Sequence, residues 1–243
     1  ESDETNNVYG PHAVYVGCVV ASSDKSDDFD DGSLDGKWST VNIGSGVNGV
    51  VTEGGCSSPA DGDCLDISGY GSSIWNTSDN FFYIYQSISG DFDVRLRAIY
   101  PPSNGGAKIG VMVRNSTAAN SRHVMLTARD SDGERLQFAY RPGDGNNTSY
   151  AGSELNPAPA PPVWLRIVRE GDNFAYYYSH QDFPGDNWTL HSSGAAVDME
   201  DTVLIGIAHA KYSTWGSIGQ SQVDEFVVCQ ASSVDPIPTP PGL

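Results

Sequence analysis

The chain has 243 residues, with 31 Asp and Glu against 13 Lys and Arg, and its formal net charge is −18 at pH 7. A surface with this excess of negative charge repels nucleic acids and anionic membranes, so we exclude both as partners. The 38% of hydrophobic residues are enough for a core, while 27 glycines and 14 prolines favour turns over long helices. No apolar stretch reaches the length of a membrane-spanning helix.

The sequence predicts a chain of short strands. Residues 1–13 are a polar N-terminal arm without a periodic pattern. After the arm, apolar or alternating runs are separated by turn segments such as "DSDG", "PGDGNN" and "FPGDN". The runs predict strands at 14–20, 27–30, 64–69, 81–88, 92–100, 107–114, 122–129, 135–141, 163–169, 173–179, 203–209 and 222–229. Residues 231–243 are a Pro-rich tail or linker, which leaves one domain over residues 14–230.

Two runs show the alternation that favours a sheet. In "RLQFAYR", Leu136, Phe138 and Tyr140 share one face, and in "FAYYYS" every second residue is a large aromatic that points the same way. A period of two is typical of a strand with one packed face, and no segment keeps a helical period. We therefore expect an all-β, antiparallel two-sheet sandwich.

The four cysteines indicate an oxidising compartment. Cys56 and Cys64 lie in a Gly-, Ser-, Pro- and Asp-rich loop, whereas Cys18 and Cys229 lie in apolar runs near the two chain ends. Of the three possible pairings we favour Cys56–Cys64 and Cys18–Cys229, because sandwiches often bring terminal strands together. No zinc-site spacing is present. Disulfides predict a secreted or cell-surface protein. Five glycosylation sequons fit this location: Asn76, Asn115, Asn146, Asn147 and Asn187.

Several blocks resemble one family in content and order. "DDFDDGSLDGKW", "SISGDFDVRLRA", "GGAKIGVMVRNS", "PPVWLRIVREGDNFAYYYS" and "QVDEFVV" are similar to concanavalin A-like modules of the DUF1349/LamG-like type, over about residues 27–229. The resemblance implies a jelly-roll sandwich, with Phe29, Leu34 and Trp38 in its core. Such modules are usually accessory parts of secreted glycan-active or surface proteins, and they often carry a structural calcium. The fold by itself does not fix a function.

The sequence does not favour an enzyme. Glycoside hydrolysis needs two carboxyl groups about 5 to 10 Å apart, and glucanases on this fold carry an E-x-D-x-x-E strand that is absent here. The nearest acidic pair is Asp91 and Asp93, which we interpret as a turn aspartate and a strand aspartate opposite Arg95 or Arg97. The histidines are scattered, and no serine stands in a G-x-S-x-G turn.

Acidic residues near the first predicted strand are candidate calcium ligands, although "DDFDDGSLDG" does not match the EF-hand spacing. On a strand, Asp28 and Asp30 would share one face, with Asp31 next to them. Asp224 would approach them if the first and last strands are neighbours. One structural Ca²⁺ bound by these four carboxylates is one interpretation. The other is a solvated acidic edge that discourages aggregation and needs no metal.

Aromatic and planar polar side chains suggest a binding site. Sugar sites combine aromatic faces with a few polar groups, and the candidates are Trp75, Tyr85, Arg114, Tyr140, Tyr212 and Trp215. Tyr212 and Trp215 lie in a polar, Gly-containing loop, where exposed aromatics favour contact with a sugar or a protein. We expect a non-catalytic secreted module that recognises carbohydrate or a surface polymer. The alternatives are a structural subunit of an extracellular filament or lattice linked through its terminal tails and, third, a glycoside hydrolase.

Overall fold

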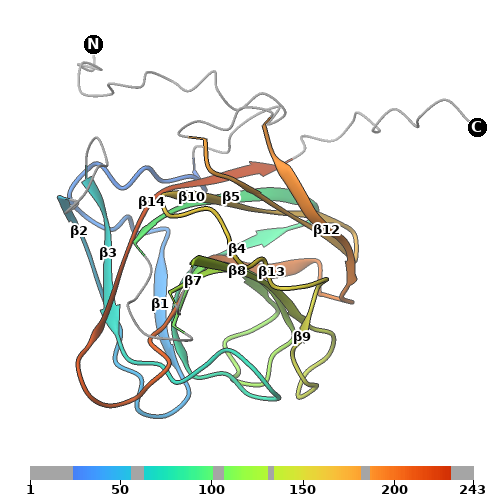
Figure 1. Ribbon diagram of the computed structural model, residues 1–243, viewed down its shortest axis with the longest axis horizontal. Helices are drawn as coiled ribbons and strands as arrows, with labels where there is room; N and C mark the ends of the chain where they lie inside the picture. The colour runs from blue at the N-terminus through green and yellow to red at the C-terminus, as the bar shows by residue number, and fades with distance from the viewer. Residues whose placement is uncertain (1–23, 56–62, 101–106, 131–133, 182–186, 231–243) are drawn as a thin grey trace, which may run out of the picture.

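The computed structural model describes residues 24–55, 63–100, 107–130, 134–181 and 187–230, which form two antiparallel sheets packed face to face (Figure 1). The strand order is β1-β4-β13-β6-β7-β8-β9 in the first sheet and β12-β11-β10-β5-β14-β3-β2 in the second. Within these ranges, no helix is long and apolar enough to span a bilayer. The arm at 1–13 and the tail at 231–243, on which the filament hypothesis depends, lie outside the described residues.

Each sheet has seven strands. The first sheet comprises β1 (Ser39–Ile43), β4 (Phe81–Ser89), β13 (Thr202–Ala210), β6 (Lys108–Arg114), β7 (His123–Asp130), β8 (Glu134–Arg141) and β9 (Ser149–Tyr150). The second comprises β12 (Thr189–Ala196), β11 (Asn173–Ser179), β10 (Val163–Glu170), β5 (Phe92–Tyr100), β14 (Gly219–Gln230), β3 (Asp63–Gly69) and β2 (Val50–Gly55). The predicted all-β sandwich is therefore confirmed. The sequence pattern did not predict β1, β2, β9 and β12. The strand predicted at 14–20 lies outside the described residues.

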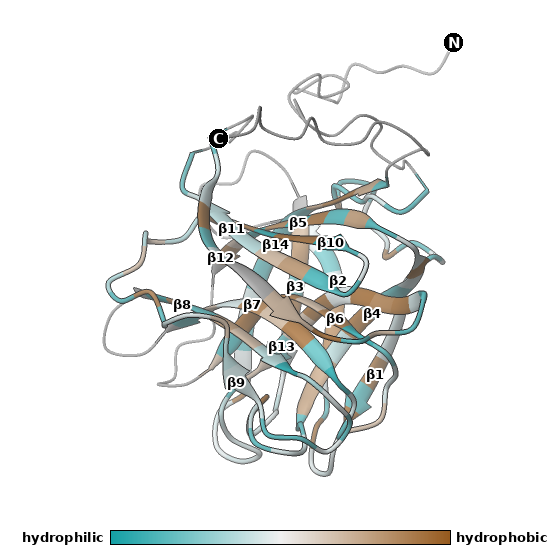
Figure 2. Cartoon of the chain, turned by 90° about the vertical axis from the view of Figure 1, so that its right-hand side faces the viewer, coloured by the Kyte–Doolittle hydropathy of each residue, from teal (hydrophilic) through white to brown (hydrophobic). Residues whose placement is uncertain are grey.

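The main core fills the space between the sheets. Along β13, Val203, Ile205 and Ile207 are buried in this core, and along β8 Leu136 and Phe138 are buried there as the alternation predicted. Figure 2 shows the most hydrophobic positions on the strands, where they are interspersed with hydrophilic ones. Burying each such side chain stabilises the fold by about 1.5–3 kcal/mol.

A second apolar cluster covers the opposite face of the first sheet. Phe81, Tyr83, Met112 and Met125 belong to it, together with Ile74 from the connection between β3 and β4. This connection, residues 71–80, is called the finger loop below. Its base is closed by main-chain bridges from Gly71 to Ser213 and from Ser73 to Asn80. Every residue of β6 is buried as a result, which corrects the expectation of a sheet with only one packed face.

Asp27 connects the acidic segment at residues 24–38 to the sandwich. Its main chain pairs with Phe226 of β14, and its carboxylate accepts hydrogen bonds from the Phe29 amide at 3.0 Å and the Trp38 indole at 2.6 Å. Phe29 has a φ of +59°, so the expected strand at 27–30 is a single bridge followed by a turn. Phe29 and Trp38 are buried in the main core and Leu34 packs against it, as the resemblance implied.

The described cysteines are consistent with the disulfide hypothesis. Cys64 and Cys229 are both disulfide-bonded. They are not bonded to each other, because Leu65 pairs with Val223 and Cys229 lies roughly 20 Å further along β14, beyond the ~7 Å that a disulfide allows between Cα atoms. Cys18 and Cys56 lie outside the described residues, so the pairing stays a prediction.

Candidate functional site

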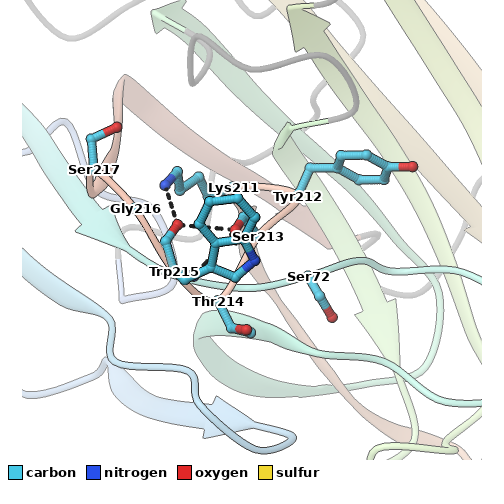
Figure 3. Close-up of a pocket in the computed structure, with 8 residues that line it drawn as sticks. All are labelled: Ser72, Lys211, Tyr212, Ser213, Thr214, Trp215, Gly216 and Ser217. Carbon is cyan, nitrogen blue, oxygen red and sulfur yellow. Dashed lines mark hydrogen bonds between the residues drawn. The ribbon is translucent and has the colours of Figure 1, made fainter.

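An open hollow of about 650 Å³ lies where the β13–β14 connection meets the base of the finger loop (Figure 3). We call it the Trp215 hollow. It is lined by Ser72 and by seven consecutive residues of the connection: Lys211, Tyr212, Ser213, Thr214, Trp215, Gly216 and Ser217. Most of the lining side chains carry hydroxyl groups, and two are aromatic.

The backbone of this connection is held in a tight path. Tyr212 and Gly216 both adopt positive φ angles, +69° and +83°. Only a residue without a side chain adopts this conformation freely. Glycine therefore suits position 216, whereas the backbone of Tyr212 is strained. Ser213 exchanges two main-chain hydrogen bonds of 3.1 Å with Gly71, which ties the connection to the finger loop.

Side chains beneath the connection fix the backbone of Trp215. The Lys211 ammonium donates to the Trp215 carbonyl at 2.9 Å, and the Ser213 hydroxyl donates to the same oxygen at 3.0 Å. The Trp215 amide donates to the Ser213 hydroxyl at 3.1 Å, and the Tyr70 hydroxyl donates to the Gly216 carbonyl at 2.7 Å. The main chain of Trp215 is therefore held in one conformation by its neighbours.

The rings themselves face solvent. Trp215 is 79% exposed, Tyr212 54% and Ile218 52%, whereas Trp38 and Trp164 are buried. Large apolar side chains grouped on a surface gain no burial energy from folding, and such groups mark contact sites. A fixed backbone that presents an exposed indole is suited to stacking against a flat apolar face.

Comparison with solved structures places the sandwich among known folds. The GH43 protein BlXynB from Bacillus licheniformis matches 85% of this chain at 17% identity, with a TM-score of 0.60 over 39% of its own length. A protein of unknown function from Saccharomyces cerevisiae matches 79% of this chain over 95% of its own length, at 15% identity and a TM-score of 0.54. The cellulose induced protein Cip1 matches 84% of this chain over 95% of its own length, at 14% identity and a TM-score of 0.50. The fold is a concanavalin A-like sandwich.

These likenesses show the fold alone, because all three identities are below one fifth. The chain spans about two fifths of the length of the GH43 protein that it matches. No protein-family model matches the sequence. No curated protein is significantly similar to it either. The narrower resemblance to DUF1349/LamG-like modules therefore stays a prediction.

The other sugar-binding candidates lie apart from the hollow. Arg114 is not available to a ligand, because it is fully buried and bonded to Asp79, and Tyr140 packs against the main core. Tyr85 stacks on Tyr83 with the ring centroids 5.2 Å apart. Trp75 of the finger loop packs against Tyr150 of β9, with the ring centroids 4.9 Å apart. The structure thus brings together only the Tyr212 and Trp215 candidates.

A buried charge cluster holds the finger loop against the first sheet. Asp79 accepts hydrogen bonds from Arg114 of β6 and from Arg141 of β8, and all three side chains are fully buried. Arg141 also donates to the Asn76 carbonyl at 3.1 Å. Burial lowers the pKa of the neighbouring His123, whose Nδ1 lies 3.5 Å from the Asp79 carboxylate. The cluster closes the outer face of the first sheet rather than opening it to a ligand.

The expected calcium ligands differ in burial and in their partners. Asp28, Asp30 and Asp31 are exposed, and Asp31 accepts a hydrogen bond from the Ser33 amide at 3.0 Å. Asp224 is buried and ion-paired with Arg97 at 2.7 Å. Burial raises the pKa of Asp224 to about 7, since the Arg97 contact offsets it only in part. Among the described residues, no group of three or more His, Cys, Asp or Glu is arranged to hold a metal ion. Calcium stays a prediction.

The sequons all fall within the described ranges. Asn76, Asn146, Asn147 and Asn187 are exposed, and Asn115 is half-buried with its side-chain oxygen accepting a hydrogen bond from the Glu200 amide. Their accessibility is compatible with glycosylation, and their use stays a prediction.

The sequence pattern did not indicate Ser72 or the supporting role of Lys211. Ser72 reaches the hollow only because Gly71 pairs with Ser213, a contact between distant parts of the chain. A local sequence pattern does not predict such a contact. Lys211 was visible as part of "KYSTWGSIGQ", but a lysine beside two aromatics gives no sign that its ammonium will bond a main-chain oxygen.

Proposed function

We propose that this protein is a non-catalytic carbohydrate-recognition module that binds its ligand in the Trp215 hollow. The observation that carries the proposal is the 79% exposed indole of Trp215 on a backbone that its own neighbours hold in place. Aromatic faces with a few well-placed polar groups are the usual composition of small-ligand sites. Because the main chain of Trp215 is already fixed, little backbone entropy is lost on binding, which favours affinity.

The polar part of the hollow suits a sugar. The side chains of Ser72, Thr214 and Ser217 line it, and a hydroxyl group both donates and accepts hydrogen bonds. Sugar hydroxyls have the same dual capacity, so the two sets of groups are complementary. The Trp215 indole supplies the apolar surface against which the C–H face of a sugar ring packs.

The fold supports a carbohydrate-related role without defining it. A GH43 protein and a cellulose induced protein share the sandwich, but a shared fold does not transfer activity. The acidic pair Asp91 and Asp93 has structural partners: Asp91 accepts a hydrogen bond from the Gly171 amide at 2.7 Å, and Asp93 pairs with Arg95 and Arg166. These contacts favour a binding module over a hydrolase. The bonded Cys64 and Cys229 support a secreted location.

The test is binding to a glycan array by the full chain and by Trp215→Ala. We expect at least one glycan to bind the natural protein and the variant to lose that binding while keeping its melting temperature, because the ring is exposed. Tyr150→Ala, which removes another exposed aromatic away from the hollow, serves as the control and retains binding. Binding to no glycan, or binding that survives Trp215→Ala, would overturn the proposal.

A further inference from the structure

The charges around the Trp215 hollow limit the kind of ligand that it accepts. Of the eight lining residues, Lys211 alone is charged. It is 6% exposed, its ammonium bonds the Trp215 carbonyl at 2.9 Å, and it lies 5.2 Å from the Tyr70 ring. This ammonium lies against the Trp215 backbone, so the hollow offers a carboxylate or sulfate no exposed cation with which to pair. An anionic ligand would therefore gain no ion pair to offset the loss of its hydration.

The lining also contains no carboxylate. Calcium is bound by several oxygens, mostly from Asp, Glu and main-chain carbonyls. A bridging metal ion between sugar hydroxyls and the protein would have no acidic ligand here. The ligand must therefore be held by stacking and by hydrogen bonds from neutral groups.

The field of the whole protein acts in the same direction. With a net charge of −18, the surface repels acidic polymers before they reach the hollow. A neutral ligand does not experience this repulsion and needs no ion pair. Local and long-range electrostatics thus both favour an uncharged ligand.

The shape of the site favours a chain over a single sugar. Three exposed apolar side chains, Tyr212, Trp215 and Ile218, come from one short segment, and Figure 3 shows the Tyr212 ring directed away from the Trp215 indole. Enclosed pockets bury most of a small ligand, which a hollow with a 79% exposed indole does not do. A single sugar would leave much of this surface uncovered, whereas neighbouring units of a chain would cover it.

We infer that the ligand of the Trp215 hollow is a neutral polysaccharide, bound along its chain by Trp215 and Tyr212 without a metal ion. This inference rests on the proposed function and specifies its substrate class.

The test measures affinity by calorimetry for neutral polymers (xylan, laminarin) and acidic polymers (polygalacturonate, alginate). Each titration is repeated with excess EDTA, at high salt, and with xylose or glucose as competitor. We expect a neutral polymer to bind independently of EDTA and salt, with each monosaccharide a much poorer competitor. Trp215→Ala should weaken binding at least about tenfold, and Trp215→Phe should restore part of it. Tyr212→Asn, chosen because asparagine tolerates the left-handed backbone, should also weaken binding.

The outcomes separate the inference from the function beneath it. Three results would overturn the inference and leave a carbohydrate site in place. They are salt-sensitive binding of an acidic polymer that requires Trp215, loss of binding to neutral polymers in EDTA, and equal binding of monosaccharide and polymer. Binding of no polymer and no monosaccharide would remove the proposed function itself. Unchanged binding by Tyr150→Ala excludes a general effect of removing a surface aromatic.

Discussion

The carboxylate of Asp79 lies 2.6 Å from the guanidinium of Arg141, and both side chains are fully buried. Arg114 approaches the same carboxylate at 2.9 Å from a second strand. Burial alone would raise the pKa of Asp79, but its contacts with His123, Arg141 and Arg114 outweigh burial and hold the pKa well below the ordinary value. One aspartate of the finger loop is thus the shared counter-charge of two buried arginines on the sheet.

Asp79→Asn should therefore destabilise the protein strongly. The variant leaves Arg114 and Arg141 without a counter-charge, and breaking a buried ion pair from one side costs about 3–5 kcal/mol. Urea unfolding at neutral pH measures this loss. The control is Asp144→Asn, because Asp144 is 54% exposed and pairs with Arg122 at the surface, where a pair contributes about 0–1 kcal/mol.

The pH dependence gives this prediction a second readout. Because the folded pKa of Asp79 is lowered, its stabilisation is fully present above the ordinary aspartate pKa of 3.8 and is lost as the pH falls below that value. The difference between the natural protein and Asp79→Asn should shrink in acid. Equal stability of the two proteins at neutral pH would show that the cluster does not hold the finger loop.

Lys108 should impose the opposite dependence on pH. Its ammonium donates to the Ile74 carbonyl of the finger loop at 2.8 Å. Burial, and then the nearby Arg129, lower its pKa to about 7 from an ordinary value of 10.5. Between these two values the unfolded chain keeps a proton that the folded protein has released. The contribution of Lys108 to the free energy of unfolding therefore rises with pH across this range.

The variant Lys108→Met removes the titrating group and fills a similar volume. We expect the natural protein to gain stability relative to Lys108→Met as the pH increases from about 7 to about 10.5. Urea midpoints taken at intervals across that range measure the difference. Parallel curves for the two proteins would mean that the folded Lys108 keeps its ordinary pKa.

Local patterns were enough to predict the class of fold. Leu136 and Phe138 alternate with polar residues, and alternation of this kind directly reports which side of a strand is buried. The strands that were missed lack this signal. Four of the five residues of β1 are exposed or half-buried, and β12 has a polar sequence at the edge of its sheet.

Contacts between distant residues could not be predicted in the same way. Asp79 stands in "NTSDN", which is typical of a solvated turn, and its arginine partners are 35 and 62 residues away. The aspartate that ties the acidic segment at residues 24–38 to the sandwich is Asp27, whereas the sequence indicated Asp28, Asp30 and Asp31. Nothing local distinguishes a carboxylate that will bond an indole from its exposed neighbours.

The candidate site was predicted in part for a similar reason. Tyr212 and Trp215 were identified because aromatic residues in a polar loop have little local surface against which to pack. Arg114 and Tyr140 were included because an arginine or tyrosine on a strand gives the same pattern whether its face is open or covered. The finger loop covers the face of Arg114, and only the folded structure shows this.

Trp215 should dominate the tryptophan emission that a quencher can reach. Of the five tryptophans, Trp38 and Trp164 are buried, and Trp215 is 79% exposed. Acrylamide suits the experiment because it is neutral and is not repelled by the protein's charge. We expect Trp215→Phe to remove most of the accessible emission and Trp75→Phe, at a half-buried position, to remove little. Unchanged quenching in Trp215→Phe would show that the ring is covered in solution.

The close contact between β13 and β4 at Gly206 gives a test of the sheet itself. A Cβ atom at Gly206 would lie 2.0 Å from the Ile84 carbonyl oxygen and 2.7 Å from the Tyr85 Cα, both in the backbone of the neighbouring strand. Backbone atoms in the middle of a sheet cannot move aside without breaking the pairing on which β4 and β13 depend.

Gly206→Ala should therefore cost an amount at the upper end of the about 1–3 kcal/mol that overpacking usually costs. Gly54→Ala is the matched control, because a Cβ atom there would have no atom within 4 Å in a strand of the second sheet. Urea unfolding of the two variants gives the comparison. If Gly206→Ala proved as stable as Gly54→Ala, the two strands would have to lie further apart at this point than the structure places them.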